Sequence, residues 1–139
     1  MGQINPTGER LKKLSEDQRD QPVVMINLLR FRDRAAYAAD SGDSPCSGEE
    51  AYRRYAEVAG RMLQRIGGRV LWLASVDQVV IGEEAERWDE AILVQYPSRK
   101  TFLEMLRIPE YRDATRHRDA ALEDSRLFAC TKQVGELGD

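Results

Sequence analysis

The stretch VVMINLLRF at residues 23–31 decides the fold of this chain. Its β-branched residues and its position directly after Pro22 predict a strand. Successive side chains of a strand point to opposite faces of the sheet, and a sheet with one hydrated face alternates apolar and polar residues. This strand does not alternate, so we expect both of its faces to be covered. Its two faces would carry Val23, Met25, Asn27, Leu29 and Phe31 on one side, and Val24, Ile26, Leu28 and Arg30 on the other.

The segments around this strand predict helices and further strands. Ser47 and Glu50 form a capping box, which predicts the start of a long helix, and the glycine pair at 67–68 predicts its end. Pro97 and Ser98 precede a second helical region, which restarts at Pro109. Further strands are expected at residues 69–76, 79–82, 88–96 and 125–132, with 77–78 as a tight turn; Asn5 and Pro6 would begin a short surface helix at about residues 6–18.

This order of elements predicts an α+β fold. Two β-α-β halves that share one antiparallel sheet make a ferredoxin-like sandwich. We expect a single domain over residues 1–139, with its core at about 22–132 and a frayed tail at 133–139. Two helices can cover only one face of the sheet, so a second copy of the chain is expected to cover the other, sheet against sheet. The sequence therefore predicts a homodimer.

Charge and cysteine content exclude several classes of partner. The chain carries 21 Lys and Arg against 24 Asp and Glu, whereas domains that bind duplex nucleic acid usually have a basic excess. We therefore expect no nucleic-acid partner. The longest apolar run is too short to cross a membrane, and residues 1–6 show no secretory signal. Cys46 and Cys130 lack metal-ligand spacing and are expected to be free thiols of a cytoplasmic protein.

Several short strings occur together and in order along the chain. They are NLLRF at 27–31, GG at 67–68 before VLW at 70–72, WD at 88–89, YPSR at 96–99, PEY at 109–111 and HRDAALEDSR at 117–126. Together they resemble the family called domain of unknown function 1330, in the dimeric α/β-barrel superfamily, over about residues 22–131. The resemblance implies a ferredoxin-like fold that packs sheet to sheet as a homodimer. The superfamily includes monooxygenases, isomerases and haem-degrading enzymes, so the fold alone transfers no reaction.

Two polar side chains, Asn27 and His117, are the candidates for catalysis. His117 is the only histidine, and the flanking Arg116 and Arg118 would disfavour its cationic form and leave a neutral base that can shuttle a proton. The alternative is a surface histidine that bonds with water or with Asp113. The amide of Asn27 interrupts an apolar strand, where it would orient a substrate or, alternatively, fix a neighbouring loop or helix end.

Basic and aromatic side chains supply the candidates for substrate binding. The guanidinium fork matches a carboxylate, so Arg30, Arg99 or Arg118 would hold an anion, although a solvated surface position is the simpler explanation for any one of them. Trp72 and Trp88 would form the wall of a pocket for an aromatic molecule. The simpler alternative places both tryptophans in the core or in a dimer interface.

Taken together, these residues predict a homodimeric domain that binds a small molecule between its sheet and its helices. As an enzyme, it would carry out proton transfer or a monooxygenase-like oxidation of a small metabolite, with no cofactor and no metal. The alternative is a non-catalytic ligand-binding or structural dimer. Haem binding or degradation is a weaker alternative, because Ser98 stands where that branch of the superfamily has histidine.

Two further features are assigned structural roles or left open. Tyr52 and Tyr55 are expected to pack on the first long helix, with their hydroxyls reaching solvent. The polar segment at residues 32–47 predicts a long mobile loop, which would be either a lid or an insertion without a role.

Overall fold

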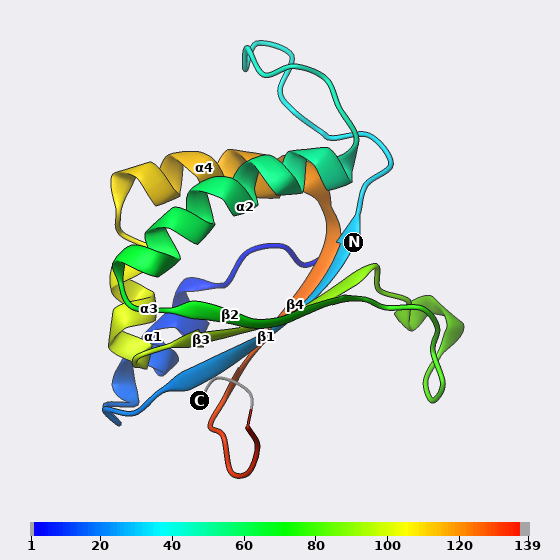
Figure 1. The fold of residues 1–139 in the computed structure, drawn as a ribbon. Helices are drawn as coiled ribbons and strands as arrows, with labels where there is room; N and C mark the ends of the chain where they lie inside the picture. The colour runs from blue at the N-terminus through cyan, green and yellow to red at the C-terminus, as the bar shows by residue number, and fades with distance from the viewer. Residues whose placement is uncertain (1, 137–139) are drawn as a thin grey trace.

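The computed structural model describes residues 2–136 and contains a four-stranded antiparallel sheet with helices on one face (Figure 1). Helices α2 and α4 lie side by side over the sheet, and α1 and α3 lie together at one end. This topology confirms the ferredoxin-like α+β fold, and residues 137–139 of the expected tail lie outside the described residues. The elements are α1 (Gly8–Glu16), β1 (Val23–Phe31), α2 (Gly48–Arg65), β2 (Arg69–Ser75), η1 (Glu84–Glu86), β3 (Glu90–Tyr96), α3 (Arg99–Met105), α4 (Pro109–Ala121) and β4 (Leu122–Cys130), with strand order β2-β3-β1-β4.

Strand β1 is central and pairs with β3 on one side and β4 on the other. Its side chains Val23, Met25 and Leu29 point toward the helices and are almost fully buried. They join apolar residues of α2, α3 and α4 in the core that holds the two layers together. The apolar run at residues 23–31 therefore forms the predicted strand, with one of its faces buried against the helices.

The predicted helix ends are largely confirmed. The Ser47 hydroxyl accepts a hydrogen bond from the Glu50 N–H at 3.0 Å, as a capping box requires. After α2, Gly67 adopts a φ of 83°, a left-handed conformation that favours glycine. Ser98 caps α3, and Pro109 begins α4. In the part of the chain that the structure describes, none of these helices has the length and apolar character needed to cross a membrane.

The N-terminal helix begins later and ends earlier than predicted. Thr7, not Asn5, is its N-cap, and the Thr7 hydroxyl accepts from the Arg10 N–H at 3.1 Å. Both candidates carry a side-chain oxygen suited to capping, so composition alone could not choose between them. Asn5 and Pro6 instead line a pocket that is described below. The helix spans Gly8–Glu16 rather than residues 6–18.

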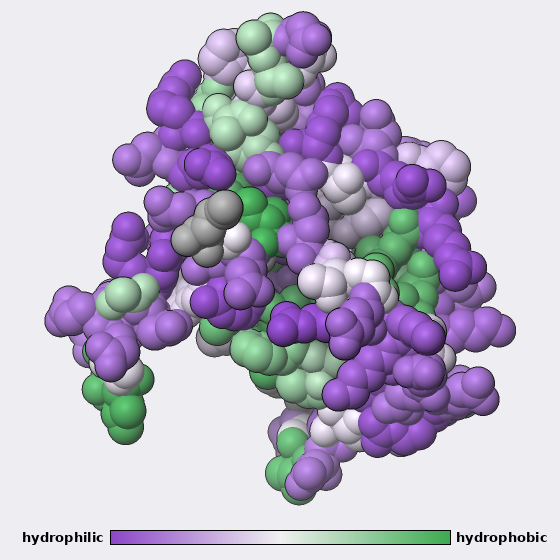
Figure 2. Space-filling model, turned by 180° about the vertical axis from the view of Figure 1, so that it is seen from behind, coloured by the Kyte–Doolittle hydropathy of each residue, from purple (hydrophilic) through white to green (hydrophobic). Residues whose placement is uncertain are grey.

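The predicted strand at residues 79–82 is wrong. This segment is a loop, and the strand that pairs with β2 is β3. Val80 and Ile81 are 81% and 96% exposed, and in Figure 2 the tip of this loop is an apolar projection at the left. β3 begins at Glu90 rather than Trp88, and β4 runs from Leu122 to Cys130 rather than over 125–132.

The sheet face opposite the helices carries an apolar row across all four strands. Strand register places Trp72, Leu93, Ile26 and Phe128 next to one another in that order. No helix of the described residues covers this face, as Figure 1 shows. Trp72 and Phe128 are about half exposed in the single chain. Packing against the helices thus explains the apolar residues on one face of β1. The apolar residues on its other face are not covered by any described helix.

The segment at residues 32–47 contains neither helix nor strand, as predicted. Its base is held by backbone hydrogen bonds from the Arg32 N–H to the Ala121 carbonyl at 2.8 Å and from the Gly48 N–H to the Arg32 carbonyl at 3.1 Å. The Ala36 N–H also bonds with the Ala120 carbonyl at 2.8 Å. The loop is therefore fastened to the end of α4.

Candidate functional site

A pocket of about 890 Å3 lies between the sheet, α4 and the N-terminal segment. Its apolar wall comes from α1, β1 and α3, and its polar wall comes from β1, α2, β3 and α4. Tyr111 and Arg118 both reach it because they lie two turns apart on the same face of α4. The apolar side chains include Leu11, Leu14, Met25, Phe102 and Leu106, and the polar ones include Asn27, Tyr55, Tyr96, Tyr111 and Arg118.

Asn27 lies in this pocket, on the helix side of β1. Its Nδ2 donates to the Ile92 carbonyl of the neighbouring strand over 3.4 Å, which is long for such a bond. Its Oδ1 has no hydrogen-bond partner among the described residues. The amide therefore keeps most of its hydrogen-bonding capacity for a molecule in the pocket.

Three buried tyrosines form the inner wall. The hydroxyls of Tyr55 and Tyr111 share a hydrogen bond of 2.8 Å, and their rings meet edge to face. Burial raises the pKa of Tyr55, Tyr96 and Tyr111, so all three phenols are neutral at physiological pH. The expectation that the Tyr55 hydroxyl reaches solvent is wrong, because α2 turns this side chain inward onto α4.

Arg118 brings a positive charge to the same wall. Its guanidinium is partly buried, and Nη1 donates to the Ile4 carbonyl at 2.5 Å. The charge of Arg118 opposes the effect of burial on the pKa of Tyr55, Tyr96 and Tyr111, which places the guanidinium within electrostatic reach of all three phenols. Of the predicted site residues, Asn27 and Arg118 are therefore brought together in one pocket.

His117 does not line this pocket. Adjacent residues point about 100° apart around a helix, so His117 faces the loop at 32–47 while Arg118 faces the sheet. The His117 Nδ1 and the Tyr37 hydroxyl form a hydrogen bond of 2.5 Å, and Arg54 donates to the same hydroxyl at 3.3 Å. Burial, together with the charge of Arg116, lowers the pKa of His117. The expected grouping of His117 with Asn27 is absent.

An ion pair from Arg116 of α4 also fastens the same loop to this helix. The Arg116 guanidinium contacts the Asp43 carboxylate at 3.1 Å and the Asp113 carboxylate at 2.7 Å. The hydrogen bond from Arg116 lowers the pKa of Asp43. Together with the Tyr37–His117 contact, the Arg116–Asp43 pair holds the loop against α4.

Arg30, Trp88 and Trp72 lie away from the pocket. Arg30 donates to the carbonyls of Ala85 and Arg87 and stacks on Trp88, with its guanidinium carbon 5.1 Å from the ring centre. Arg126 stacks on the same indole at 5.0 Å. These contacts give Arg30 and Trp88 a role in holding the segment before β3, and Trp72 belongs to the open sheet face.

Arg99 is also remote from the pocket. It is almost fully buried at the start of α3, with Nε 3.4 Å from the Asp17 carboxylate and Nη2 3.4 Å from the Thr131 hydroxyl. Its Nη1 has no hydrogen-bond partner in the described part of the chain. Arg99 is therefore not a solvated surface arginine, which was the simpler explanation for this residue.

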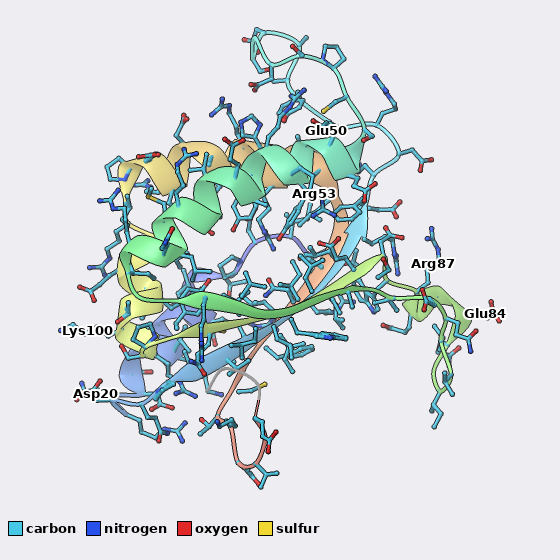
Figure 3. The ribbon with its side chains drawn as sticks, viewed as in Figure 1. Asp20, Glu50, Arg53, Glu84, Arg87 and Lys100 are labelled. Atoms are coloured by element: carbon cyan, nitrogen blue, oxygen red, sulfur yellow. The ribbon has the colours of Figure 1, made fainter. Side chains whose placement is uncertain are left out.

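A second, smaller depression lies near the loop base. It has a volume of about 360 Å3 and a mainly polar lining that includes Asp89 and Glu90. Arg53 points from α2 toward the sheet and pairs with the buried Glu90 at 2.6 Å (Figure 3). The Asp89 carboxylate accepts from the Phe31 N–H at 2.8 Å. Both carboxylates are thus engaged within the fold.

The chemistry of these residues bears on metal and haem binding. Within residues 2–136, no three or more His, Cys, Asp or Glu side chains are grouped so that they could hold a metal ion. The only histidine, His117, bonds with Tyr37 and lies outside the pocket. The pocket therefore does not supply the imidazole that the haem alternative requires.

Two pocket tyrosines that were not predicted as site residues carry a periodic signal in the sequence, whereas the N-terminal lining residues carry none. Tyr96 alternates with the buried Ile92 and Val94 on β3, and Tyr111 shares a helix face with Arg118, so periodicity points them inward. Nothing in the sequence indicated that the residues before α1 fold back over the pocket. Gln3, Ile4, Asn5 and Pro6 all line it.

The topology and the inner pocket define a protein of the ferredoxin-like class with a pocket between its sheet and its helices. The chain belongs to the family described as Domain of unknown function (DUF1330), whose model matches residues 35–130. The match begins after β1, so the N-terminal wall of the pocket lies outside it. No sequence among curated proteins matches this chain significantly.

Solved structures extend this likeness. The chain is similar to RPA0582, a protein of unknown function from Rhodopseudomonas palustris, with 38% identity, a TM-score of 0.90 and coverage of 97% of this chain and 100% of that chain. The hydroxynitrile lyase from Passiflora edulis shares 12% identity and a TM-score of 0.55 over 84% of this chain and 100% of its own. At3g17210 from Arabidopsis thaliana shares 13% identity and a TM-score of 0.51 over 83% and 99%. At such low identity the last two show the fold alone.

Proposed function

We propose that this protein binds a small, mainly apolar molecule in the pocket between its sheet and α4. The observation that carries the proposal is the lining. A cavity of about 890 Å3 combines apolar walls with the incompletely bonded side chains of Asn27 and Arg118. Small-molecule sites are usually concave and apolar, with a few polar groups that fix the orientation of the ligand.

Binding without an assigned reaction is better supported than the enzymatic hypothesis. Proton transfer by His117 would need the imidazole beside the substrate, and His117 instead faces the loop at 32–47. In the pocket, Asn27 would orient the ligand, and the phenols of Tyr55 and Tyr111 would donate or accept hydrogen bonds as neutral groups. Arg30, Trp72 and Trp88 have no part in this site.

We further propose a homodimer that forms through the open sheet face. The row Trp72, Leu93, Ile26 and Phe128 supports it, because monomers rarely expose a large contiguous apolar patch. A stable interface of this kind would bury about 1,600 Å2 in total. Free thiols at Cys46 and Cys130 support a reducing, cytoplasmic location.

The binding proposal is tested with two neighbouring substitutions on α1. Leu11 lines the pocket and Lys12 does not, so L11W narrows the pocket and K12W adds the same side chain outside it. No residue of α1 is buried, so neither change threatens the core. Ligand-observed NMR would measure the binding of benzoate, phenylacetate and isovalerate and of their neutral amides.

We expect the wild-type protein and K12W to bind at least one of these six compounds, and L11W to lose that binding. Circular dichroism would confirm that both variants are folded. Binding that survives unchanged in L11W would place the ligand elsewhere. The absence of binding by the wild-type protein at millimolar concentration would refute the proposal.

A further inference from the structure

The pocket is positively charged although the chain as a whole is acidic. The net charge of the protein is −3. The charged residues that line the pocket are nevertheless four arginines and one aspartate: Arg10, Arg112, Arg118, Arg126 and Asp113. The single carboxylate, Asp113, is already paired with Arg116 at 2.7 Å. The local potential therefore favours an anion.

The four arginines differ in how they are engaged. Arg126 pairs with Asp124 at 2.7 Å and stacks on Trp88, so its positive charge is already compensated within the fold. Arg10 and Arg112 are exposed, and neither forms an ion pair with a described residue. Both side chains line the pocket and keep their charged groups in water. Arg118 differs from both, because it is partly buried.

Among the described residues, Arg118 has no anionic partner. A guanidinium has five N–H donors, and the contact of Arg118 within residues 2–136 is the single bond from Nη1 to the Ile4 carbonyl. A cation removed from water is costly unless an anion and further hydrogen bonds compensate it. The neighbouring Tyr55, Tyr96 and Tyr111 are neutral phenols, so they cannot supply that negative charge. An anionic partner for Arg118 would therefore come from outside residues 2–136.

The Ile4 carbonyl that Arg118 contacts belongs to an N-terminal segment that is also hydrogen-bonded to β4. The Gln3 N–H donates to the Asp124 carboxylate at 2.8 Å, and the Ser125 hydroxyl donates to the Gln3 carbonyl at 2.7 Å. These bonds fasten the N-terminal segment to β4 independently of Arg118. Arg118 can therefore exchange the Ile4 carbonyl for a ligand without detaching the segment.

We propose that the ligand of this pocket is a small carboxylate whose anionic group binds Arg118 in place of the Ile4 carbonyl. Its apolar part would lie against Leu14, Met25 and Phe102. This assignment rests on the proposed binding function and names the chemical class of the ligand. A carboxylate suits the site because it accepts two parallel N–H bonds from one guanidinium.

The test compares each carboxylate with its neutral amide of nearly the same shape: benzoate with benzamide, phenylacetate with phenylacetamide, and isovalerate with isovaleramide. Titrations followed by NMR give both dissociation constants. We expect the wild-type protein to bind the carboxylate at least about tenfold more tightly, as a charge-assisted contact allows. The backbone amide of Asn5, which shares its peptide bond with the Ile4 carbonyl, should shift with the carboxylates only.

Three variants separate the possible outcomes. R118Q should bind carboxylate and amide within about twofold of each other, and R118K should keep part of the preference as a point charge without the fork. The control R107Q removes an exposed arginine that does not line the pocket, and it should keep the full preference. Equal binding of acid and amide by the wild-type protein, or a preference that survives in R118Q, would overturn the carboxylate assignment and leave the binding function intact. If none of the six compounds binds, both proposals fail.

Discussion

Replacing Gly48 with alanine tests how the base of the loop at 32–47 is built. Gly48 is the first residue of α2, and its N–H donates to the Arg32 carbonyl at 3.1 Å. A Cβ added there would lie 2.2 Å from the Arg32 carbonyl oxygen and 2.7 Å from the Ala121 carbonyl oxygen. Both obstacles are backbone atoms, and the Arg32 N–H is itself bonded to the Ala121 carbonyl at 2.8 Å. A side-chain rotation cannot relieve this contact.

The size of the effect follows from that geometry. Relief requires a backbone shift of about 1 Å, which overpacks the junction at a cost of about 1–3 kcal/mol and weakens a hydrogen bond worth about 1 kcal/mol. We therefore expect G48A to lower the free energy of unfolding by about 2–4 kcal/mol. Gly60 provides the matched control in the same helix, because a Cβ there would meet nothing within 4 Å. G60A should raise the free energy of unfolding by about 0.5–1 kcal/mol through helix propensity.

Urea denaturation followed by far-UV circular dichroism measures both changes, with unchanged m-values as the check that unfolding remains two-state. Opposite signs for the two alanines would support the close approach of three backbone segments at Gly48. A G48A protein that unfolds within about 0.5 kcal/mol of the wild type would refute it. In that case the loop base would not be held as the structure indicates.

Two predictions concern the titrating histidine and the open sheet face. Burial and Arg116 lower the pKa of His117 below its ordinary value of 6.5, so its neutral form contributes stability above that pH, and this contribution is lost as the pH falls through the lower folded pKa. The wild-type protein should therefore lose more unfolding free energy than H117Q between about pH 7 and pH 5; equal losses would contradict the burial of the imidazole. W72E should convert the proposed dimer to a monomer of 15.9 kDa in light scattering at micromolar concentration. L73E alters the next residue of β2, of similar exposure (53% against 49%) but on the other face, and should leave the dimer intact; a monomeric wild-type protein would refute the sheet-to-sheet arrangement.

Much of the fold was predictable because local signals agreed with the tertiary arrangement. The apolar run at 23–31, the cap at Ser47 and the proline at 109 each act through a few neighbouring residues. The prediction at residues 79–82 failed because β-branched residues have strand propensity wherever they occur. Whether they form a strand depends on tertiary pairing, and β2 pairs with β3 rather than with this segment.

The candidate site was less predictable than the fold. Asn27 was identified because an amide in an apolar strand is costly unless it is bonded, which is a property of composition alone. Arg118 could be identified as a guanidinium that suits a carboxylate, but not distinguished from Arg30 or Arg99. Only tertiary structure puts Arg118 beside three phenols, Arg30 on an indole and Arg99 against Asp17.

The sequence by itself determined most of the strand and helix pattern and the apolar character of both faces of β1, because hydrophobic periodicity and capping are short-range properties. Short strings in a fixed order indicated the family. The tertiary structure decided which side chains share a cavity. A rotation of about 100° between adjacent residues of α4 sends His117 to the loop and Arg118 to the pocket. Periodicity places Arg118 on the same face as Tyr111, but nothing in the sequence states that this face lines a cavity. The N-terminal wall was decided the same way, by contacts between Gln3 and Ser125 that no local rule connects.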